Sequence, residues 1–316
     1  MASRDKEATQ LQVFDAKAVR RHRERAARGS RAAEFLFIEG AARLADRLKD
    51  VSREFSQALE LGSRGGLLAR DLRDSGGIAS LVASDPAAGF LSGLADPGLV
   101  AEAEALPFAP ASFDLVVSNL ALHWVNDLPG TLLQLRQALK PDGLLLLSLF
   151  AGETLNELRL CLLEAESEIE NGASPRVAPF ADPRELAGLL QRAGFALPVV
   201  DTDRIEATYP DALSLMRDLR AMGETNAVAA RRRSFTRRAT VLRAAELYQA
   251  RYAGADGRIV ARFEIATLTA WAPHQSQPKP LRPGSAATRL ADALGAEEKS
   301  AGEAARPAAS RGKPKP

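Results

Sequence analysis

Short apolar runs alternate with amphipathic stretches in the first half of the chain. The runs are brief, rich in leucine, valine and alanine, and bounded by polar residues or glycine, as buried strands are; they lie at 58–61, 78–83, 99–103, 113–118 and 144–149. Strands that alternate with helical segments predict βαβ units and a parallel sheet. The run at 144–150 is apolar at nearly every position, so it predicts a central strand covered by helices on both faces.

Helical periodicity appears before, within and after this region. Apolar residues recur every three or four positions in five segments, at 14–28, 35–48, 154–170, 211–222 and 236–252. Residues 258–271 instead alternate between apolar and polar types, and this pattern predicts a long antiparallel strand at an edge of the sheet.

Two short motifs predict helix ends. The Lys-Pro-Asp-Gly sequence at 140–143 ends the preceding helix, because proline lacks a backbone donor and glycine allows an unstrained reversal. Asp182 and Pro183 have the residue types of an N-cap and of a first helical position. They predict a helix that ends at residues 193–194.

Composition narrows the class of protein. The chain has 316 residues, of which 46% are hydrophobic, enough for one large α/β domain with additions. Its single cysteine, Cys161, excludes an internal disulfide and predicts a packed thiol in a reducing compartment. No apolar run approaches the roughly 20 residues of a membrane span, and no secretory signal is apparent. We therefore expect a cytoplasmic protein of bacterial origin.

Charge gives little indication of a polyanionic partner. The formal net charge is +2, from 42 basic and 40 acidic residues. Two local clusters of arginine are predicted to be solvated faces, with an acidic protein partner or RNA as the alternative; they are Arg20, Arg21, Arg23, Arg25 and Arg28, and Arg231, Arg232, Arg233, Arg237 and Arg238. Aromatic residues make up only 5% of the chain, which argues against nucleic acid.

A glycine-rich turn follows the first predicted strand. Glu60, Gly62, Ser63 and Gly66 lie where a strand passes into a helix, a place where backbone can approach a ligand closely. Such turns serve several nucleotides, including NAD and FAD, and also simple tight packing. A phosphate-cradling P-loop is disfavoured because no Gly-Lys-Ser/Thr follows.

Two acidic residues follow the next two predicted strands. Asp85 lies 23 residues after Gly62, where a carboxylate can accept hydrogen bonds from both hydroxyls of a ribose, although Asp85-Pro86 is also a plausible helix cap. Glu102 follows the third strand beside an apolar segment and can accept from the exocyclic amine of adenine. The order glycine turn, ribose acid, adenine acid predicts a nucleoside cofactor.

These segments together resemble the successive motifs of class I S-adenosylmethionine (SAM) methyltransferases. The resemblance lies in Glu-Leu-Gly at 60–62, Asp85, Glu-Ala-Glu-Ala-Leu-Pro-Phe at 102–108, Phe-Asp-Leu-Val-Val-Ser-Asn at 113–119 and Lys-Pro-Asp-Gly at 140–143. It implies a doubly wound, seven-stranded, Rossmann-like α/β sheet with an inserted helical cap, and SAM as cofactor. It assigns Glu60 and Gly62 to the methionine side, Asp85 to the ribose, Glu102 to the adenine and Asn119 to the rim of the fourth strand.

Two positions depart from the family pattern. Arg64 stands at the middle glycine of the Gly-x-Gly-x-Gly turn, where a side chain is expected to crowd the methionyl pocket unless Gly65 or Gly66 takes over the close approach. The adenine acid is a glutamate, Glu102, in place of the usual aspartate.

The resemblance also suggests a division of the chain. It predicts N-terminal helices, a SAM-binding Rossmann-like core, a helical cap with the sixth strand, a final strand with a C-terminal motif, and a disordered tail; these are 1–50, 51–150, 151–257, 258–286 and 287–316.

A narrower resemblance covers about nine tenths of the chain. The segments at 120–129, 152–159, 201–203, 215–226, 274–277 and 282–286 resemble the branch of complex I assembly factor 5, described as protein arginine hydroxylases on a methyltransferase scaffold. The resemblance implies an enzyme of the SAM methyltransferase superfamily whose substrate is an arginine on a subunit of respiratory complex I. It also implies a protein partner and allows peripheral association with the membrane through complex I.

The reaction and its catalytic residues stay open at this point. His123 and Trp124 follow the fourth strand, so His123 is a candidate for proton transfer and Trp124 for stacking on a cation or cofactor, with ordinary packing as the alternative. The three histidines are far apart in sequence, and no metal site is predicted. A conventional methyltransferase similar to malonyl-acyl-carrier-protein O-methyltransferase, and a noncatalytic assembly chaperone, are the competing functions.

Overall fold

The computed structural model describes residues 12–29, 33–75, 77–278, 292 and 295. The predicted C-terminal motif at 282–286 lies outside the described residues, as does nearly all of the predicted disordered tail at 287–316. The chain divides into two compact units, residues 1–275 and 276–316. Everything that follows concerns the first of them.

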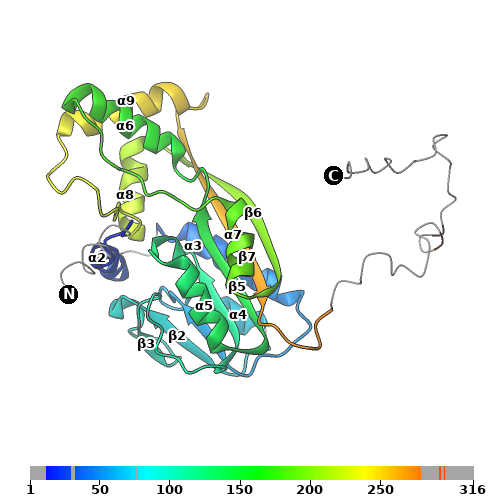
Figure 1. Cartoon of the computed structure of the whole chain (residues 1–316). Coiled ribbons are helices and arrows are strands. Elements are labelled where there is room, and N and C mark those ends of the chain that lie inside the picture. Colours follow the sequence, from blue (N-terminus) through cyan, green and yellow to red (C-terminus); the bar gives the residue numbers. More distant parts are fainter. Residues whose placement is uncertain (1–11, 30–32, 76, 279–291, 293–294, 296–316) are drawn as a thin grey trace, which may run out of the picture. The chain divides into compact units, whose positions relative to one another are not determined.

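A seven-stranded sheet forms the centre of this unit (Figure 1). The strands run in the order β3-β2-β1-β4-β5-β7-β6, and β7 is antiparallel to both neighbours whereas β1 to β5 pair in parallel. Their bounds are Ala58–Leu61 (β1), Leu81–Asp85 (β2), Gly98–Val100 (β3), Phe113–Asn119 (β4), Leu139–Ala151 (β5), Ala196–Tyr209 (β6) and Ile259–Trp271 (β7). The doubly wound α/β prediction is confirmed, and the strand order reverses between β1 and β4, where such sheets bind ligands.

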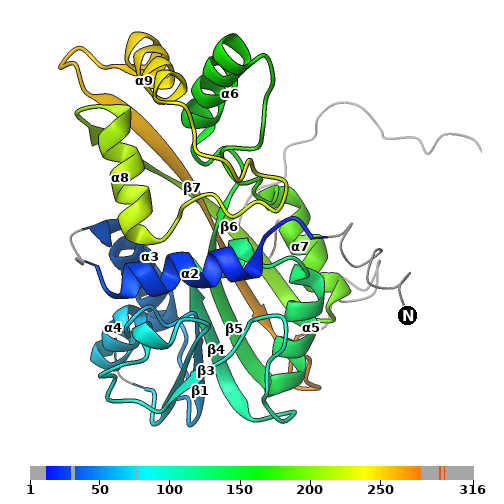
Figure 2. The same cartoon turned by 90° about the vertical axis from the view of Figure 1, so that its left-hand side faces the viewer.

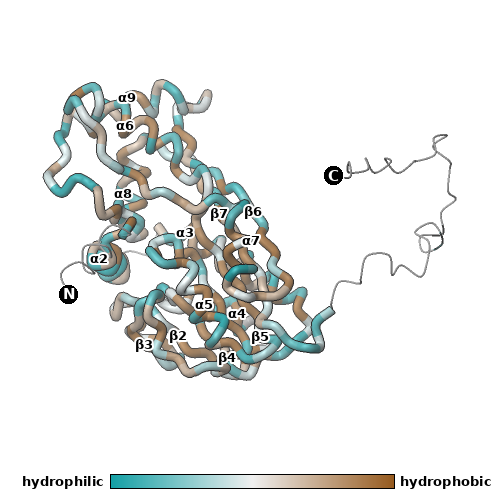
Figure 3. Tube along the Cα trace, viewed as in Figure 1, coloured by the Kyte–Doolittle hydropathy of each residue, from teal (hydrophilic) through white to brown (hydrophobic). Residues whose placement is uncertain are grey.

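Helices cover both faces of the sheet (Figure 2). On one face, α3 (Phe35–Lys49) and α4 (Leu67–Ser75) share an apolar cluster with β1, β2, β4 and β5. On the other, α5 (Leu128–Ala138) and α7 (Pro183–Arg192) pack in a second cluster. The predicted N-cap of α7 is confirmed, because Asp182 accepts a hydrogen bond from the Arg184 N–H at 2.9 Å and Pro183 is the first helical residue. Hydrophobic residues concentrate along the strands between these layers (Figure 3).

Three further helices form a cap above the carboxyl edge of the sheet. They are α6 (Asn156–Glu170), α8 (Ala212–Met222) and α9 (Arg238–Tyr252), and they pack together through a cluster that contains the buried Cys161. Burial raises the pKa of the Cys161 thiol to about 11, which agrees with the predicted packed, unreactive thiol. The N-terminal helix α2 (Ala16–Ala27) crosses between this cap and the strands (Figure 2).

Two sequence predictions about strands are wrong. The alternating segment at 258–271 forms β7, which lies between β5 and β6 and is not an edge strand; β6 is the edge. Alternation in β7 occurs mainly in its first half, where one face is less covered, so it reports partial burial of a face and not a missing neighbour. Residues 140–143 do not precede the fifth strand either. β5 starts at Leu139 and includes them as an irregular stretch with Asp142 at φ +62°.

The described residues contain no helix that is long and apolar enough to cross a membrane.

Candidate functional site

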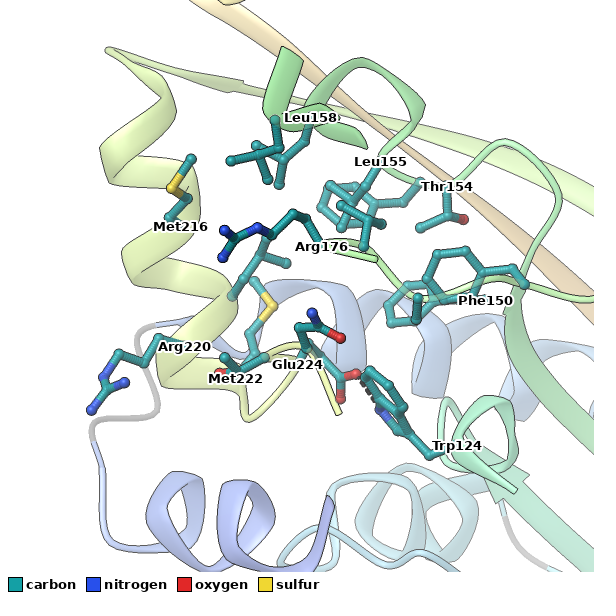
Figure 4. A pocket seen from close by; sticks show the side chains of 18 of the residues that line it. Trp124, Phe150, Thr154, Leu155, Leu158, Arg176, Met216, Arg220, Met222 and Glu224 are labelled. Atoms are coloured by element: carbon teal, nitrogen blue, oxygen red, sulfur yellow. Dashed lines mark hydrogen bonds between the residues drawn. The ribbon is translucent and has the colours of Figure 1, made fainter. Parts of the chain in front are cut away.

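Two cavities of about 260 Å³ each lie at the carboxyl edge of the sheet, and Trp124 lines both. We call the first the strand-edge cavity; its walls include Leu61, Gly62, Pro86, Glu102 and Ala121. We call the second the cap cavity; its walls include Phe150, Leu158, Met216, Met222 and Glu224 (Figure 4).

The strand-edge cavity is assembled by the ends of four parallel strands. Gly62 follows β1, Pro86 follows β2, Glu102 lies just after β3 and Ala121 just after β4. Gly62 has φ +76°, and a Cβ there would lie 2.3 Å from the Ala121 Cβ, so only glycine lets these two turns meet. Glu102 is exposed at the rim, and partial burial raises the pKa of its carboxyl group. Two of the predicted cofactor residues, Gly62 and Glu102, therefore line one cavity.

Asp85 is buried just behind this cavity and is paired with an arginine from α2. Its carboxylate accepts from Arg23 Nε at 3.2 Å and Arg23 Nη2 at 2.5 Å, and from the backbone N–H groups of Arg64 and Ala87. Asp85 is fully buried and Arg23 is 3% exposed. Burial disfavours the charge of Arg23, but the adjacent Asp85 carboxylate more than offsets this and raises the arginine pKa.

Arg23 was not predicted at the site. The sequence prediction of a solvated arginine face on this helix is wrong for Arg23, which points inward and also lines the strand-edge cavity. Its partner is 62 residues away along the chain, so no local spacing identifies the pair.

Arg64 lies in the glycine turn and directs its side chain away from the strand-edge cavity. Its backbone has φ +48°, and Gly65 and Gly66 also have positive φ. The guanidinium carbon lies 3.3 Å from the centroid of the Phe37 ring, and Nη2 donates to the Met222 carbonyl. Burial, reinforced by the charge of Arg23, lowers the pKa of Arg64 to about 10. The Arg64 side chain was expected to crowd the methionyl pocket. It instead occupies space beside Met222, on the cap side of the turn.

The remaining predicted cofactor residues lie behind the cavity wall. Glu60 is 1% exposed, and burial raises the pKa of its carboxyl group to about 7. Hydrogen bonds from Ser63 and from the Ala69 backbone act in the opposite direction but are outweighed by burial. Ser63 Oγ accepts from the Gly66 N–H at 3.2 Å and so stabilises the turn. Asn119 donates to the Phe37 carbonyl at 2.7 Å and accepts from Ser148 Oγ at 3.0 Å, which ties β4 to α3 and β5.

His123 and Trp124 share one carboxylate oxygen. They belong to a single 3-10 turn, Leu122–Trp124, and Glu224 Oε2 lies 2.9 Å from His123 Nε2 and 2.7 Å from Trp124 Nε1, which donates to it. Burial alone would raise the pKa of Glu224, but the charge of His123 with hydrogen bonds from His123 and Trp124, together with Arg64, lowers it. An ionised Glu224 requires the proton on His123 Nε2, so this arrangement fixes the tautomer and orientation of the imidazole.

Glu224 was not singled out by the sequence. It stands in the segment 215–226 that carries the family resemblance, but it is 101 residues from His123. The cap places it, because α8 ends at Met222 and the capping residue Gly223, with φ +83°, turns the chain down toward the 3-10 turn. Within the described residues, no group of three or more His, Cys, Asp or Glu side chains is arranged to hold a metal ion.

Comparison with known proteins agrees with this geometry. The methyltransferase domain family matches residues 23–198, and the mouse (Mus musculus) protein named arginine-hydroxylase NDUFAF5, mitochondrial, is 40% identical over 87% of this chain and 82% of its own length. The chain belongs to the methyltransferase domain family. It also falls in the branch that contains the NDUFAF5 proteins.

Two other relatives bound the comparison. Malonyl-[acyl-carrier protein] O-methyltransferase of Gallionella capsiferriformans is 33% identical over 83% of this chain and 92% of its own length. Among solved structures, the YcgJ protein of Bacillus subtilis matches with a TM-score of 0.51 over 73% of this chain and 98% of its own, at 14% identity. That likeness shows the fold, and the NDUFAF5 branch has the higher identity of the two sequence comparisons. The chain is therefore an enzyme-family member with the methyltransferase fold, as its sequence motifs predict.

Proposed function

We propose that this protein binds SAM in the strand-edge cavity and hydroxylates an arginine of a respiratory complex I subunit during assembly of that complex. The observation that carries the proposal is the pair of cavities on either side of Trp124, in a chain that is 40% identical to arginine-hydroxylase NDUFAF5 over most of its length. One cavity lies where the fold binds nucleosides, and the other is enclosed by the inserted cap.

The residues fit SAM with one condition. Glu102 offers a carboxylate at the rim and Leu61, Ala103 and Leu122 offer apolar walls, which suits an adenine. Both oxygens of Asp85 already accept hydrogen bonds, so a ribose gains Asp85 only if Arg23 gives up at least one of its bonds. When bound, SAM supplies a sulfonium-linked methyl group. The role of the chain's own residues is to hold its nucleoside beside Trp124.

Hydroxylation requires an oxidant that side chains do not supply. A monooxygenation combines dioxygen, two electrons and two protons to give one hydroxyl group and one water, so the proposal includes dioxygen and an external reductant. His123, whose Nε2 lies 2.9 Å from Oε2 of Glu224 at the wall of the cap cavity, is a titratable group that can move a proton.

The partner and compartment belong to the same proposal. The protein partner is a complex I subunit, and we propose that the protein meets it in the bacterial cytoplasm. The alternative function is methyl transfer to malonyl-acyl-carrier protein. It is supported by the 33% identity to malonyl-[acyl-carrier protein] O-methyltransferase. A noncatalytic chaperone would use the same cap as a binding surface.

Deletion of the gene in its host tests the proposal. Peptides of the complex I subunits are weighed in the parent and deletion strains, and the deletion is complemented by the wild-type gene. We expect one arginine-containing peptide from the parent strain to be heavier by the mass of one oxygen atom, and we expect this added mass to be absent in the deletion strain. Loss of one methylene mass indicates methyl transfer instead, and failed assembly without any mass change indicates the chaperone.

A further inference from the structure

One oxygen of the Glu224 carboxylate is left without a hydrogen-bond partner at the wall of the cap cavity. Glu224 Oε2 is shared by His123 and Trp124, whereas Oε1 is buried and accepts no hydrogen bond within the described structure. The nearest cation, Arg64 Nη1, lies 4.0 Å from Oε1, beyond hydrogen-bond distance. The side chain is 6% exposed and is directed toward the Trp124 indole (Figure 4). A buried acceptor left open in this way costs free energy unless a donor reaches it.

The charges around Glu224 leave room for one more cation. The buried charged side chains that act on Glu224 or Arg64 comprise two guanidinium groups and three carboxylates: Arg23, Arg64, Glu34, Asp85 and Glu224. This group has one carboxylate more than it has cations, an excess that His123 offsets only with a second proton on its imidazole. Coulomb attraction in a poorly solvated site then favours a ligand with a single positive charge.

The other charged residues of the cap cavity do not compensate this excess. Arg176 is held by both oxygens of Glu166, at 2.6 and 3.1 Å. Arg220 is exposed and points away from the cavity (Figure 4).

The rest of the cavity suits a long apolar stem that ends in a planar cation. Leu158, Leu219, Met222 and Phe150 form apolar walls, and Trp124 stands next to the carboxylate. A guanidinium group stacks on aromatic rings and donates in the plane to a carboxylate, whereas an ammonium group is more strongly hydrated. An anionic acyl group would meet a buried carboxylate here, which opposes its binding.

We propose that Glu224 is a specificity-determining residue that receives the guanidinium group of an arginine side chain in the cap cavity. This inference rests on the proposed function, in which the cap cavity is the substrate side. Glu224 thus joins two tasks, since Oε2 orients His123 and Trp124 while Oε1 is available to the substrate.

Binding of small arginine derivatives tests this without any turnover. The probes are N-acetyl-L-arginine amide and its citrulline counterpart, which has nearly the same shape and no charge. The chain has two tryptophans, so a Trp271→Phe background leaves Trp124, at the cavity wall, as the single tryptophan, which is excited selectively over tyrosine. We expect the arginine probe to change Trp124 emission and the citrulline probe to bind about tenfold more weakly or worse.

Glu224→Gln, which keeps the size of the side chain, is expected to lower arginine affinity by about tenfold or more. Glu246→Gln, on the exposed surface of α9, is the charge-matched control and is expected to leave affinity unchanged. Equal binding of the arginine and citrulline probes by the protein with Glu224 intact would overturn the inference, and that comparison needs no substitution in the cap cavity. So would full arginine affinity in Glu224→Gln.

Binding of S-adenosylhomocysteine, the demethylated product of SAM, is measured on the same samples. Its absence would count against the proposed function, whereas cofactor binding without arginine preference would count against Glu224 alone.

Discussion

The ion pair between Arg23 and Asp85 is the most consequential contact at the residue scale. Replacing Arg23 with alanine leaves a fully buried carboxylate with only two backbone donors, and removing one partner of a buried pair costs about 3–5 kcal/mol. Arg43→Ala is the control, because Arg43 pairs with Glu39 and Asp203 at the surface and such pairs contribute about 1 kcal/mol or less. Urea unfolding measures both. Equal losses in the two variants would show that the Arg23 pair is not the buried contact described.

The buried carboxyl group of Glu60 is expected to make the free energy of unfolding depend on pH. Burial raises its pKa to about 7, so the folded protein holds this proton to higher pH than the unfolded chain does. The contribution to stability is therefore full below about pH 4.5 and is lost as the pH rises through 7. Glu60→Gln resembles the protonated form at every pH. We expect its free energy of unfolding to match the wild type near pH 4.5 and to exceed it by on the order of 3 kcal/mol at pH 8. A difference that does not change with pH would contradict this.

Residues that follow a strand could be predicted from sequence, and their distant partners could not. Gly62, Asp85 and Glu102 stand at strand ends, and parallel strands bring their ends to one edge. Arg23 and Glu224 meet their partners only because α2 crosses the edge and the cap descends on it. Neither contact produces a periodicity or a local spacing in the sequence by which it could be predicted.

At the element scale, the junction of α2 with the end of α8 holds Glu224 in place. Gly223 has φ +83°, and a Cβ there would lie 3.1 Å from both the Ala26 Cβ and the His22 carbonyl oxygen. Gly257 has a similar φ of +74° with nothing within 4 Å. Gly257→Ala is expected to cost only the left-handed strain, roughly 1–2 kcal/mol. Gly223→Ala should cost about 1–3 kcal/mol more, because α2 must shift. Equal unfolding free energies would refute close packing at this junction.

Most elements were predictable because their signals are local. Caps, proline and glycine positions, and periodicity identified α7, α8 and α9 to within two residues of their ends. The order of the strands in the sheet has no such local signal. Alternation in β7 gave the wrong position, since a half-covered face inside a sheet produces the same pattern as an edge.

At the scale of the whole molecule, the two cavities combine a family fold with an added cap. The apolar runs in the sequence predict the parallel half of the sheet, and the methyltransferase motifs lie at the ends of its strands. The cap cavity is formed by segments from 124 to 263, so its shape depends on tertiary packing that sequence patterns do not encode. Arg23 and Trp124 link the two sides, because both line the strand-edge cavity, the helix of Arg23 packs against α8, and Trp124 donates to Glu224.

Calorimetric titration of S-adenosylhomocysteine into the folded protein tests the central claim most directly. The account predicts saturable binding at one site and stabilisation that grows with ligand concentration. It predicts that Glu102→Ala, an exposed change that leaves the fold intact, weakens binding by about tenfold. Absence of binding heat together with an unchanged melting temperature at saturating ligand would contradict the claim that a nucleoside occupies the strand-edge cavity.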